Sequence, residues 1–73
     1  MARERLDLRG VKCPLSWAHA RVRLETMATG EELELLVDEA QAATDIPRAA
    51  EASGHHVVGV TDDGPLWRIT IEA

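Results

Sequence analysis

The chain has a single cysteine, Cys13, among its 73 residues, and no apolar run approaches the roughly 18 residues of a membrane-spanning helix. A lone cysteine cannot form an internal disulfide, so the fold must be stabilised by packing alone or by a partner. The first five residues also lack the apolar stretch of a secretion signal. A free thiol without such a signal is typical of a reducing compartment, and we therefore expect a cytoplasmic protein with no membrane segment.

The short length also limits what the chain can build. Seventy-three residues, 45% of them hydrophobic, suffice for one globular domain over residues 1–73 but not for two cores. No internal repeat, interdomain linker or low-complexity tract interrupts the sequence. A chain of this size has too little volume for an enclosed active-site cavity, so any chemistry is expected at its surface.

Positive charge is scarce overall and is concentrated near the N-terminus. The net charge of −5 argues against direct nucleic-acid binding and against binding to an anionic membrane. Residues 1–24 carry six bases and two acids, a charge of +4, whereas residues 25–73 carry two bases and eleven acids, a charge of −9. The asymmetry is either ordinary surface solvation or a positive field around Cys13 that favours a thiolate and steers an acidic partner.

Hydrophobic periodicity predicts a strand followed by a helix in the first third of the chain. Residues 5–8 alternate between polar and apolar, and Gly10 ends this strand. From residue 14 to about residue 28 apolar residues recur at helical spacing, and Pro14 suits the first helical position. The predicted buried stripe of this helix is Trp17, Ala20, Leu24 and Met27.

A second strand and a second helix follow. Residues 32–38 form the strand, and its buried face is predicted to hold Leu33, Leu35 and Val37. Thr44 is the predicted N-cap of the helix, Pro47 lies in its predicted first turn, and Gly54 lies just past its end.

The chain closes with two β-rich runs, residues 56–61 and 66–72, joined by a predicted hairpin turn over residues 62–65. The order is therefore β-α-β-α-β-β. Two helices cannot cover both faces of a four-stranded sheet, so we predict an α+β fold. It is a two-layer sandwich with both helices on one face of a mixed sheet.

Cys13 lies where the first strand passes into the first helix. Unpaired backbone N–H groups and the positive end of the helix dipole favour a thiolate at such a place. The alternative is a small buried apolar residue, which is common for cysteine. Gly10, Lys12 and Arg9 surround the position with loop and charge rather than with apolar residues, which favours a reactive thiol.

The stretch Leu6-Asp7-Leu8-Arg9-Gly10-Val11-Lys12-Cys13-Pro14 resembles the signature of the TusA/SirA-like sulfur-carrier family, L-D-x-x-G-x-x-C-P-x-P. The resemblance covers essentially the whole chain. Further matches are Arg21 in the first helix, Met27 and Gly30-Glu31 at its end, and Asp38 through Asp45-Ile46-Pro47, the acidic loop and the stretch that opens the second helix. The fold of the family agrees with the predicted order of elements.

Two positions depart from the family pattern. Ser16 replaces the second proline of the signature, and Ala42 stands where relatives often carry threonine. Serine restores a backbone N–H at the third helical position, so the Cys13 sulfur could accept a hydrogen bond from Ser16. The substitution trades rigidity of the first turn for this donor, or it marks a subfamily with a changed partner or weaker chemistry.

The resemblance implies a sulfur relay in which Cys13 carries sulfane sulfur as a persulfide. The donor would be a cysteine desulfurase or a rhodanese-like protein, and the acceptor would be a cysteine of another sulfur-relay protein. The chain has no second cysteine to resolve the persulfide, so the sulfur must leave to another molecule. No bound cofactor is implied. The predicted environment of the persulfide comprises Arg9, Gly10, Lys12, Pro14, Ser16 and Arg21.

Other functions remain open from the sequence. The chain could be a non-catalytic interaction or regulatory module on the same fold, or a thiol redox sensor. A metal site of Cys13 with His19, His55 and His56 is disfavoured, because their spacing matches no tetrahedral zinc pattern. The pathway of a carrier is equally open, since transfer-RNA thiolation, molybdenum cofactor, sulfur oxidation and selenium metabolism all use carriers of this family.

Overall fold

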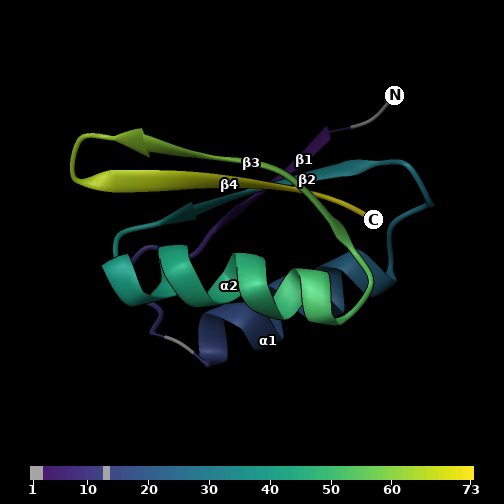
Figure 1. The fold of residues 1–73 in the computed structure, drawn as a ribbon, viewed down its shortest axis with the longest axis horizontal. Coiled ribbons are helices and arrows are strands. Elements are labelled where there is room, and N and C mark those ends of the chain that lie inside the picture. The colour runs from purple at the N-terminus through teal and green to yellow at the C-terminus, as the bar shows by residue number, and fades with distance from the viewer. Residues whose placement is uncertain (1–2, 13) are drawn as a thin grey trace.

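The computed structural model describes residues 3–12 and 14–73. Its elements are β1 (Arg3–Asp7), α1 (Leu15–Glu25), β2 (Glu32–Val37), α2 (Ala40–Ala52), β3 (His56–Asp63) and β4 (Leu66–Glu72). Figure 1 shows two layers, with both helices against the same face of the sheet. The predicted β-α-β-α-β-β order and the two-layer α+β architecture are confirmed. Neither helix is long and apolar enough to cross a membrane within the described ranges.

The sheet is mixed, with strand order β1-β2-β4-β3. β1 pairs parallel with β2, because α1 crosses over between them, whereas β4 pairs antiparallel with both of its neighbours. In this register Leu6 lies opposite Leu35, and Leu35 lies opposite Ile69. The apolar residues of three strands therefore line up on one face.

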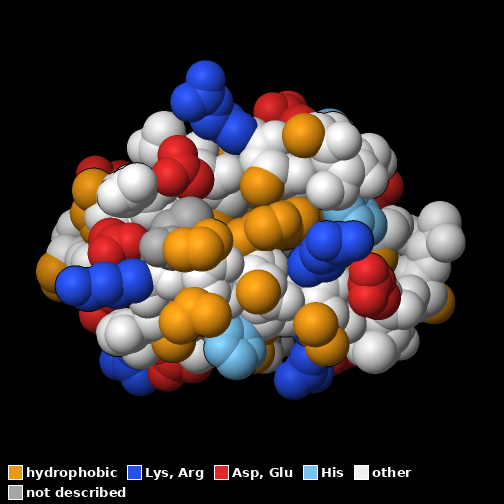
Figure 2. All heavy atoms as spheres, turned by 90° about the horizontal axis from the view of Figure 1, so that it is seen from below, with side chains coloured by type: hydrophobic (Ala, Val, Ile, Leu, Met, Phe, Trp, Pro, Cys, Tyr) orange, Lys and Arg blue, Asp and Glu red, His pale blue; other side chains and the backbone are white. Residues whose placement is uncertain are grey.

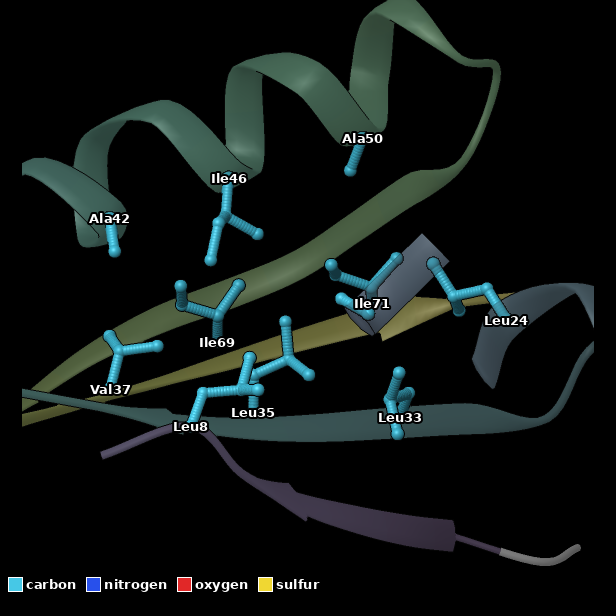
Figure 3. Packing of buried hydrophobic residues seen from close by; sticks show 11 residues of the cluster. Leu8, Leu24, Leu33, Leu35, Val37, Ala42, Ile46, Ala50, Ile69 and Ile71 are labelled. Atoms are coloured by element: carbon cyan, nitrogen blue, oxygen red, sulfur yellow. The ribbon is translucent and has the colours of Figure 1, made fainter. Parts of the chain in front are cut away.

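The core lies between that face and the helices (Figure 3). α2 contributes Ala42, Ile46 and Ala50, which are spaced four residues apart and point towards the sheet. Two of the three are alanines, so the helix can approach the strands closely. The residues of β2 and β4 that have no exposed surface are Leu33, Leu35, Val37, Ile69 and Ile71.

α1 differs from the prediction at its ends and in its buried stripe. Pro14 occupies the N-cap position rather than the first helical position, and Thr26 is the C-cap, so the helix ends before the predicted residue 28. The Thr26 hydroxyl donates to the carbonyl of Arg23 at 2.8 Å, which satisfies an acceptor of the last turn. The fully buried face is Ser16, Ala20 and Leu24, with Trp17 and Met27 packed against it half-buried.

The predicted start of the second helix was wrong. α2 begins at Ala40, after Glu39 in an extended conformation, so Thr44 and Pro47 lie inside the helix rather than at its cap and first turn. Residues 40–43 have strong helix propensity, and burial of Ala42 favours helix over a loop there. The Thr44 hydroxyl donates back to the carbonyl of Ala40 at 3.3 Å, as threonine does within a helix.

The β3–β4 hairpin is tighter than predicted. β3 continues to Asp63 and β4 begins at Leu66, so the turn consists of Gly64 and Pro65 alone. Gly64 adopts φ 75, a left-handed conformation that favours glycine and that a two-residue turn requires. The ion pair of Arg68 with Asp63, at 2.7 Å, joins the two strands next to this turn.

The face of the sheet away from the helices is polar. Arg3 and Arg5 of β1 reach across to Glu34 of β2, at 3.8 and 2.9 Å, and Arg3 also pairs with Glu32 at 2.8 Å. Leu36 lies half-buried on this face. Charged pairs thus cover the side of the sheet that no helix protects.

We predict that Leu35→Ala lowers the free energy of unfolding by about 2–5 kcal/mol, because Leu35 is fully buried between the layers. The neighbouring Leu36→Ala, on the opposite half-exposed face, should cost about 1 kcal/mol or less. Urea unfolding followed by circular dichroism measures both. If Leu35→Ala does not fold, Ile69→Val should still cost about 0.5–1.5 kcal/mol. Equal costs at positions 35 and 36 would contradict the two-layer core.

Candidate functional site

The sequence places the candidate nucleophile at Cys13, which lies outside the described residues. The structure does describe its two neighbours in the chain, and both Lys12 and Pro14 are exposed. It also describes the loop over residues 8–12 that precedes them and the helix α1 that follows them. The loop and the helix thus border position 13 on its two sides along the chain.

Hydrogen bonds from the backbone N–H groups of Leu8, Gly10 and Val11 hold the loop in place. The N–H of Leu8 donates to the carbonyl of Leu36 at 2.8 Å, which continues the pairing of β1 with β2. The N–H of Val11 donates to the carbonyl of Leu8 at 3.0 Å and closes a turn. The N–H of Gly10 donates to the Asp38 carboxylate, at 3.0 and 3.1 Å from its two oxygens. The loop is thereby fixed to the end of β2.

Asp38 was not predicted as a site residue. From the sequence alone, Asp38 is marked only by its place in the family resemblance. The signal that could have identified it is an acidic residue directly after a buried strand, where its side chain can accept from a loop N–H at the same edge of the sheet. Gly10 adopts φ 80, so the bond depends on a conformation that glycine adopts without strain.

Arg9 is held by Asp7 rather than directed at the site. Its Nε lies 3.0 Å from Oδ1 of Asp7 and its Nη2 lies 2.7 Å from Oδ2, while its backbone N–H also donates to Oδ1 at 3.0 Å. These hydrogen bonds lower the pKa of Asp7 to about 2 and raise that of Arg9. To hold an anionic sulfur as predicted, the Arg9 guanidinium would therefore have to leave the Asp7 carboxylate or be shared with it.

The first backbone hydrogen bonds of α1 are accepted by the carbonyls of the residues on either side of position 13. The N–H of Ser16 donates to the carbonyl of Lys12 at 3.1 Å, and that of Ala18 donates to the carbonyl of Pro14 at 3.1 Å. The Ser16 N–H, which the sequence assigned to the Cys13 sulfur, thus has a backbone acceptor. A bond from this N–H to sulfur would have to be shared with Lys12.

The Ser16 side chain is buried without a partner. Ser16 has no exposed surface, and its Oγ has no hydrogen-bond partner among the described residues. A buried hydroxyl in that state costs free energy, because it has lost its hydrogen bonds to water. The family proline at this position would carry no such cost.

The other two predicted bases, Lys12 and Arg21, lie at different distances from position 13. Arg21 pairs with Glu25 one turn further along α1, at 3.5 Å on an exposed face. It lies seven residues after Pro14, so it is about 10 Å along the helix axis from the first turn. Lys12, by contrast, is adjacent to Cys13 in the chain. Lys12 is therefore the predicted base whose place in the chain best suits a charge close to the sulfur.

The N-terminal turn of α1 carries no acidic residue. No side chain of the described residues caps it by a hydrogen bond either. The positive end of the helix dipole is therefore not offset within the helix, and it favours a negative charge at its mouth. A thiol at such a position has a lowered pKa as a rule.

The three histidines do not form a cluster. His19 lies on α1, His55 precedes β3 and His56 begins it. Among residues 3–12 and 14–73, no group of three or more His, Cys, Asp or Glu side chains could hold a metal ion.

Comparison with known proteins matches the arrangement to one family. Residues 4–73 match the family model described as Sulfurtransferase TusA. The chain belongs to the TusA family. A "Putative sulfur carrier protein" of Archaeoglobus fulgidus is 39% identical over 72 residues, covering 97% of this chain and 82% of the relative. One of the same name from Thermotoga maritima is 34% identical over 68 residues, covering 92% and 86%.

The fold agrees with that of a solved SirA-like protein. The crystal structure of the SirA-like protein from Desulfitobacterium hafniense superposes with a TM-score of 0.83 at 25% identity, and the match covers 96% of each chain. The resemblance to the TusA/SirA-like family stated from the sequence is therefore confirmed.

We predict that the Asp7 carboxyl titrates near pH 2 in the folded protein instead of near its ordinary pKa of 3.8. The pairing with Arg9 stabilises the folded state fully above pH 3.8, and this contribution is lost as the pH falls through about 2. Carbon-detected NMR titration of the side chain measures the midpoint. Arg9→Gln should return it towards 3.8, whereas Arg5→Gln should not. A midpoint unchanged by Arg9→Gln would contradict the assigned cause.

We predict that Ser16→Ala raises the free energy of unfolding by about 1 kcal/mol, because it removes a buried hydroxyl that has no partner among the described residues. Ser53→Ala, at the exposed C-cap of α2, is the matched control and should change stability by less than about 0.5 kcal/mol. Chemical denaturation measures both variants. A loss of stability in Ser16→Ala would mean that the hydroxyl has a partner.

Proposed function

We propose that this protein is a sulfur carrier that accepts sulfane sulfur as a persulfide on Cys13 and transfers it to a cysteine of a partner protein. The observation that carries the proposal is the mouth of α1. There, exposed Lys12 and Pro14 flank position 13, and no acidic residue offsets the helix dipole. Membership of the TusA family and the names of its relatives support the same function.

The transfer needs no oxidant or reductant. The Cys13 thiolate attacks the outer sulfur of a donor persulfide, a new S–S bond forms on Cys13, and the donor S–S bond breaks. The electron pair of the broken bond leaves with the donor sulfur as a thiolate. In the second half-reaction the acceptor thiolate attacks the outer sulfur on Cys13, and the Cys13 thiolate is the leaving group. Both halves exchange one S–S bond for another, so no net redox change occurs.

The surroundings of position 13 suit both halves of this exchange. The dipole of α1 and the charge of Lys12 stabilise an anionic sulfur, whether thiolate or persulfide. The loop before it is anchored by Asp38 at Gly10, which limits the positions that the following residues can take. An electropositive helix terminus beside an anchored loop suits the approach of a partner cysteine.

The partners follow from the chemistry of the two steps. A cysteine desulfurase or a rhodanese-like protein can supply a protein-bound persulfide, and another sulfur-relay protein with a free cysteine can accept it. Such an exchange requires free thiols on the carrier and on the acceptor, and free thiols are typical of the cytoplasm, where we expect this protein to act. Transfer-RNA thiolation is one pathway that would use the acceptor.

We predict that Cys13 gains about 32 Da, the mass of one sulfur atom, when the protein is incubated with a cysteine desulfurase, cysteine and pyridoxal phosphate. Intact-protein mass spectrometry measures the gain. Cys13→Ser should abolish it, because a hydroxyl cannot form the persulfide. Dithiothreitol should reverse it, because the S–S bond is reducible.

The same assay distinguishes the alternatives. A redox sensor would form a sulfenic acid or a mixed disulfide with peroxide when no sulfur donor is present. A non-catalytic interaction module would gain no sulfur at all and would bind its partner equally well as Cys13→Ala. Absence of any sulfur gain from the desulfurase, whether or not peroxide oxidises the thiol, would overturn the carrier function.

A further inference from the structure

The hydroxyl of Ser16 stands out among the polar groups of the described chain. Ser16 has no exposed surface, and its Oγ is the buried side-chain oxygen that has no hydrogen-bond partner among residues 3–12 and 14–73. Buried polar side-chain atoms in native proteins nearly always have a partner, so an exception requires an explanation. Alanine, or the proline of the family signature, would fill the position without an unpaired hydroxyl. A serine there points to a use for the hydroxyl in another state of the protein.

The position of Ser16 suggests which state that is. Ser16 lies in the first turn of α1, three residues after Cys13. Its N–H donates to the carbonyl of Lys12 at 3.1 Å, and this bond spans position 13. In a helical turn closed by such a bond, residues three apart are neighbours, with about 5–6 Å between their Cβ atoms. Rotation about χ1 moves a serine hydroxyl between staggered positions, so it can reach towards a side chain at position 13.

Ser16 approaches position 13 from the core side of α1. It continues the buried face formed by Ala20 and Leu24, whereas Lys12 and Pro14, on either side of position 13, are exposed. A sulfur at the boundary of these two environments can meet a partner cysteine on its solvent side and accept a hydrogen bond on the other. A hydrogen bond to an anion is stronger in such a partly buried place than in water.

The side-chain charges at this end of the molecule offset one another in part. Lys12 is positive, and Arg9 is neutralised by its ion pair with Asp7. Asp38 and Glu39 place carboxylates between β2 and α2, and a nearby carboxylate disfavours a thiolate. Figure 2 shows the helix side of the molecule, where basic and acidic side chains both lie around the hydrophobic ones. Stabilisation of an anionic sulfur therefore depends on the dipole of α1 and on hydrogen-bond donors in its first turn.

We propose that the Ser16 hydroxyl donates a hydrogen bond to the Cys13 sulfur when that sulfur is anionic, and that it is unpaired when the sulfur is a neutral thiol. The inference rests on the proposed function, because a carrier passes through the Cys13 thiolate twice. The thiolate attacks the donor persulfide in the first half-reaction and is the leaving group in the second. A lowered thiol pKa supplies more thiolate for the attack and makes the sulfur a better leaving group.

The test measures how the rate of thiol–disulfide exchange between Cys13 and dipyridyl disulfide depends on pH. Ser16→Ala should raise the midpoint by about one pH unit, the shift expected on losing one hydrogen bond to an anion. A more basic thiolate is a better nucleophile. Ser16→Ala should therefore react about threefold more slowly well below both midpoints and about threefold faster well above them. Ser53→Ala, at the exposed C-cap of α2, is the matched control and should behave as the wild type.

Two further measurements separate the hydroxyl from the backbone and from the packing. Ser16→Pro removes the N–H as well as the hydroxyl and should raise the midpoint at least as far as Ser16→Ala. The gain in stability predicted above for Ser16→Ala should be full at a pH where Cys13 is protonated. It should shrink as the pH rises through the thiol pKa, because the wild-type hydroxyl then has its anionic partner.

The results that would overturn the proposal are distinct. An unchanged midpoint in Ser16→Ala overturns it, and so does an equal shift in Ser53→Ala. A shift in Ser16→Pro alone would assign the bond to the backbone N–H instead of the hydroxyl. A lower rate of Ser16→Ala at every pH, without a shift of the midpoint, would leave the hydroxyl a structural role only. If the wild-type chain gains no sulfur from the desulfurase, the proposed function itself fails, whatever the midpoints show.

Discussion

Two helices must protect a four-stranded sheet in this chain, and the rest of the structure follows from that constraint. Apolar residues can be buried on one face of the sheet only, so β2 alternates buried leucines with charged or half-exposed positions. The uncovered face is instead held by ion pairs such as Arg5 with Glu34. α2 supplies alanines at its contact positions, which brings the layers close together. α1 is left with apolar side chains on two faces, one buried and one exposed.

The sequence predicted the architecture well because its strands alternate clearly. Leu33, Leu35 and Val37 repeat with a period of two, so a strand places all three on one face, where they are buried. Helix starts were predicted less well. Thr44 and Pro47 are typical of a helix N-terminus, but burial of Ala42 extends the helix one turn before them. The preference of Thr44 and Pro47 for a helix N-terminus was outweighed there by the helix propensity of residues 40–43 and by the packing of Ala42.

The candidate site was predictable only in part, because some of its contacts join residues that only the folded chain brings together. The cysteine and its neighbours Lys12 and Pro14 are a local motif, so they could be identified from order alone. The anchor at Asp38 joins residues 28 positions apart and needed the sheet register to be found. The pairing of Arg9 with Asp7 was also missed, although the two are close in sequence, because residue type does not reveal which of several acids a base will bind. Sequence identifies candidate charges, whereas geometry shows which are already neutralised.

The register shift between Val57 and Gly59 has a consequence for how this small protein behaves among others. β3 is an edge strand with Val58 and Val60 exposed, and a regular edge of that kind invites another strand to add to it. The irregularity interrupts the row of free backbone groups, and Asp62 and Asp63 place negative charge at its far end. The irregular pairing near Val57 and the charges of Asp62 and Asp63 therefore make β3 a poor edge for the addition of a strand from another molecule.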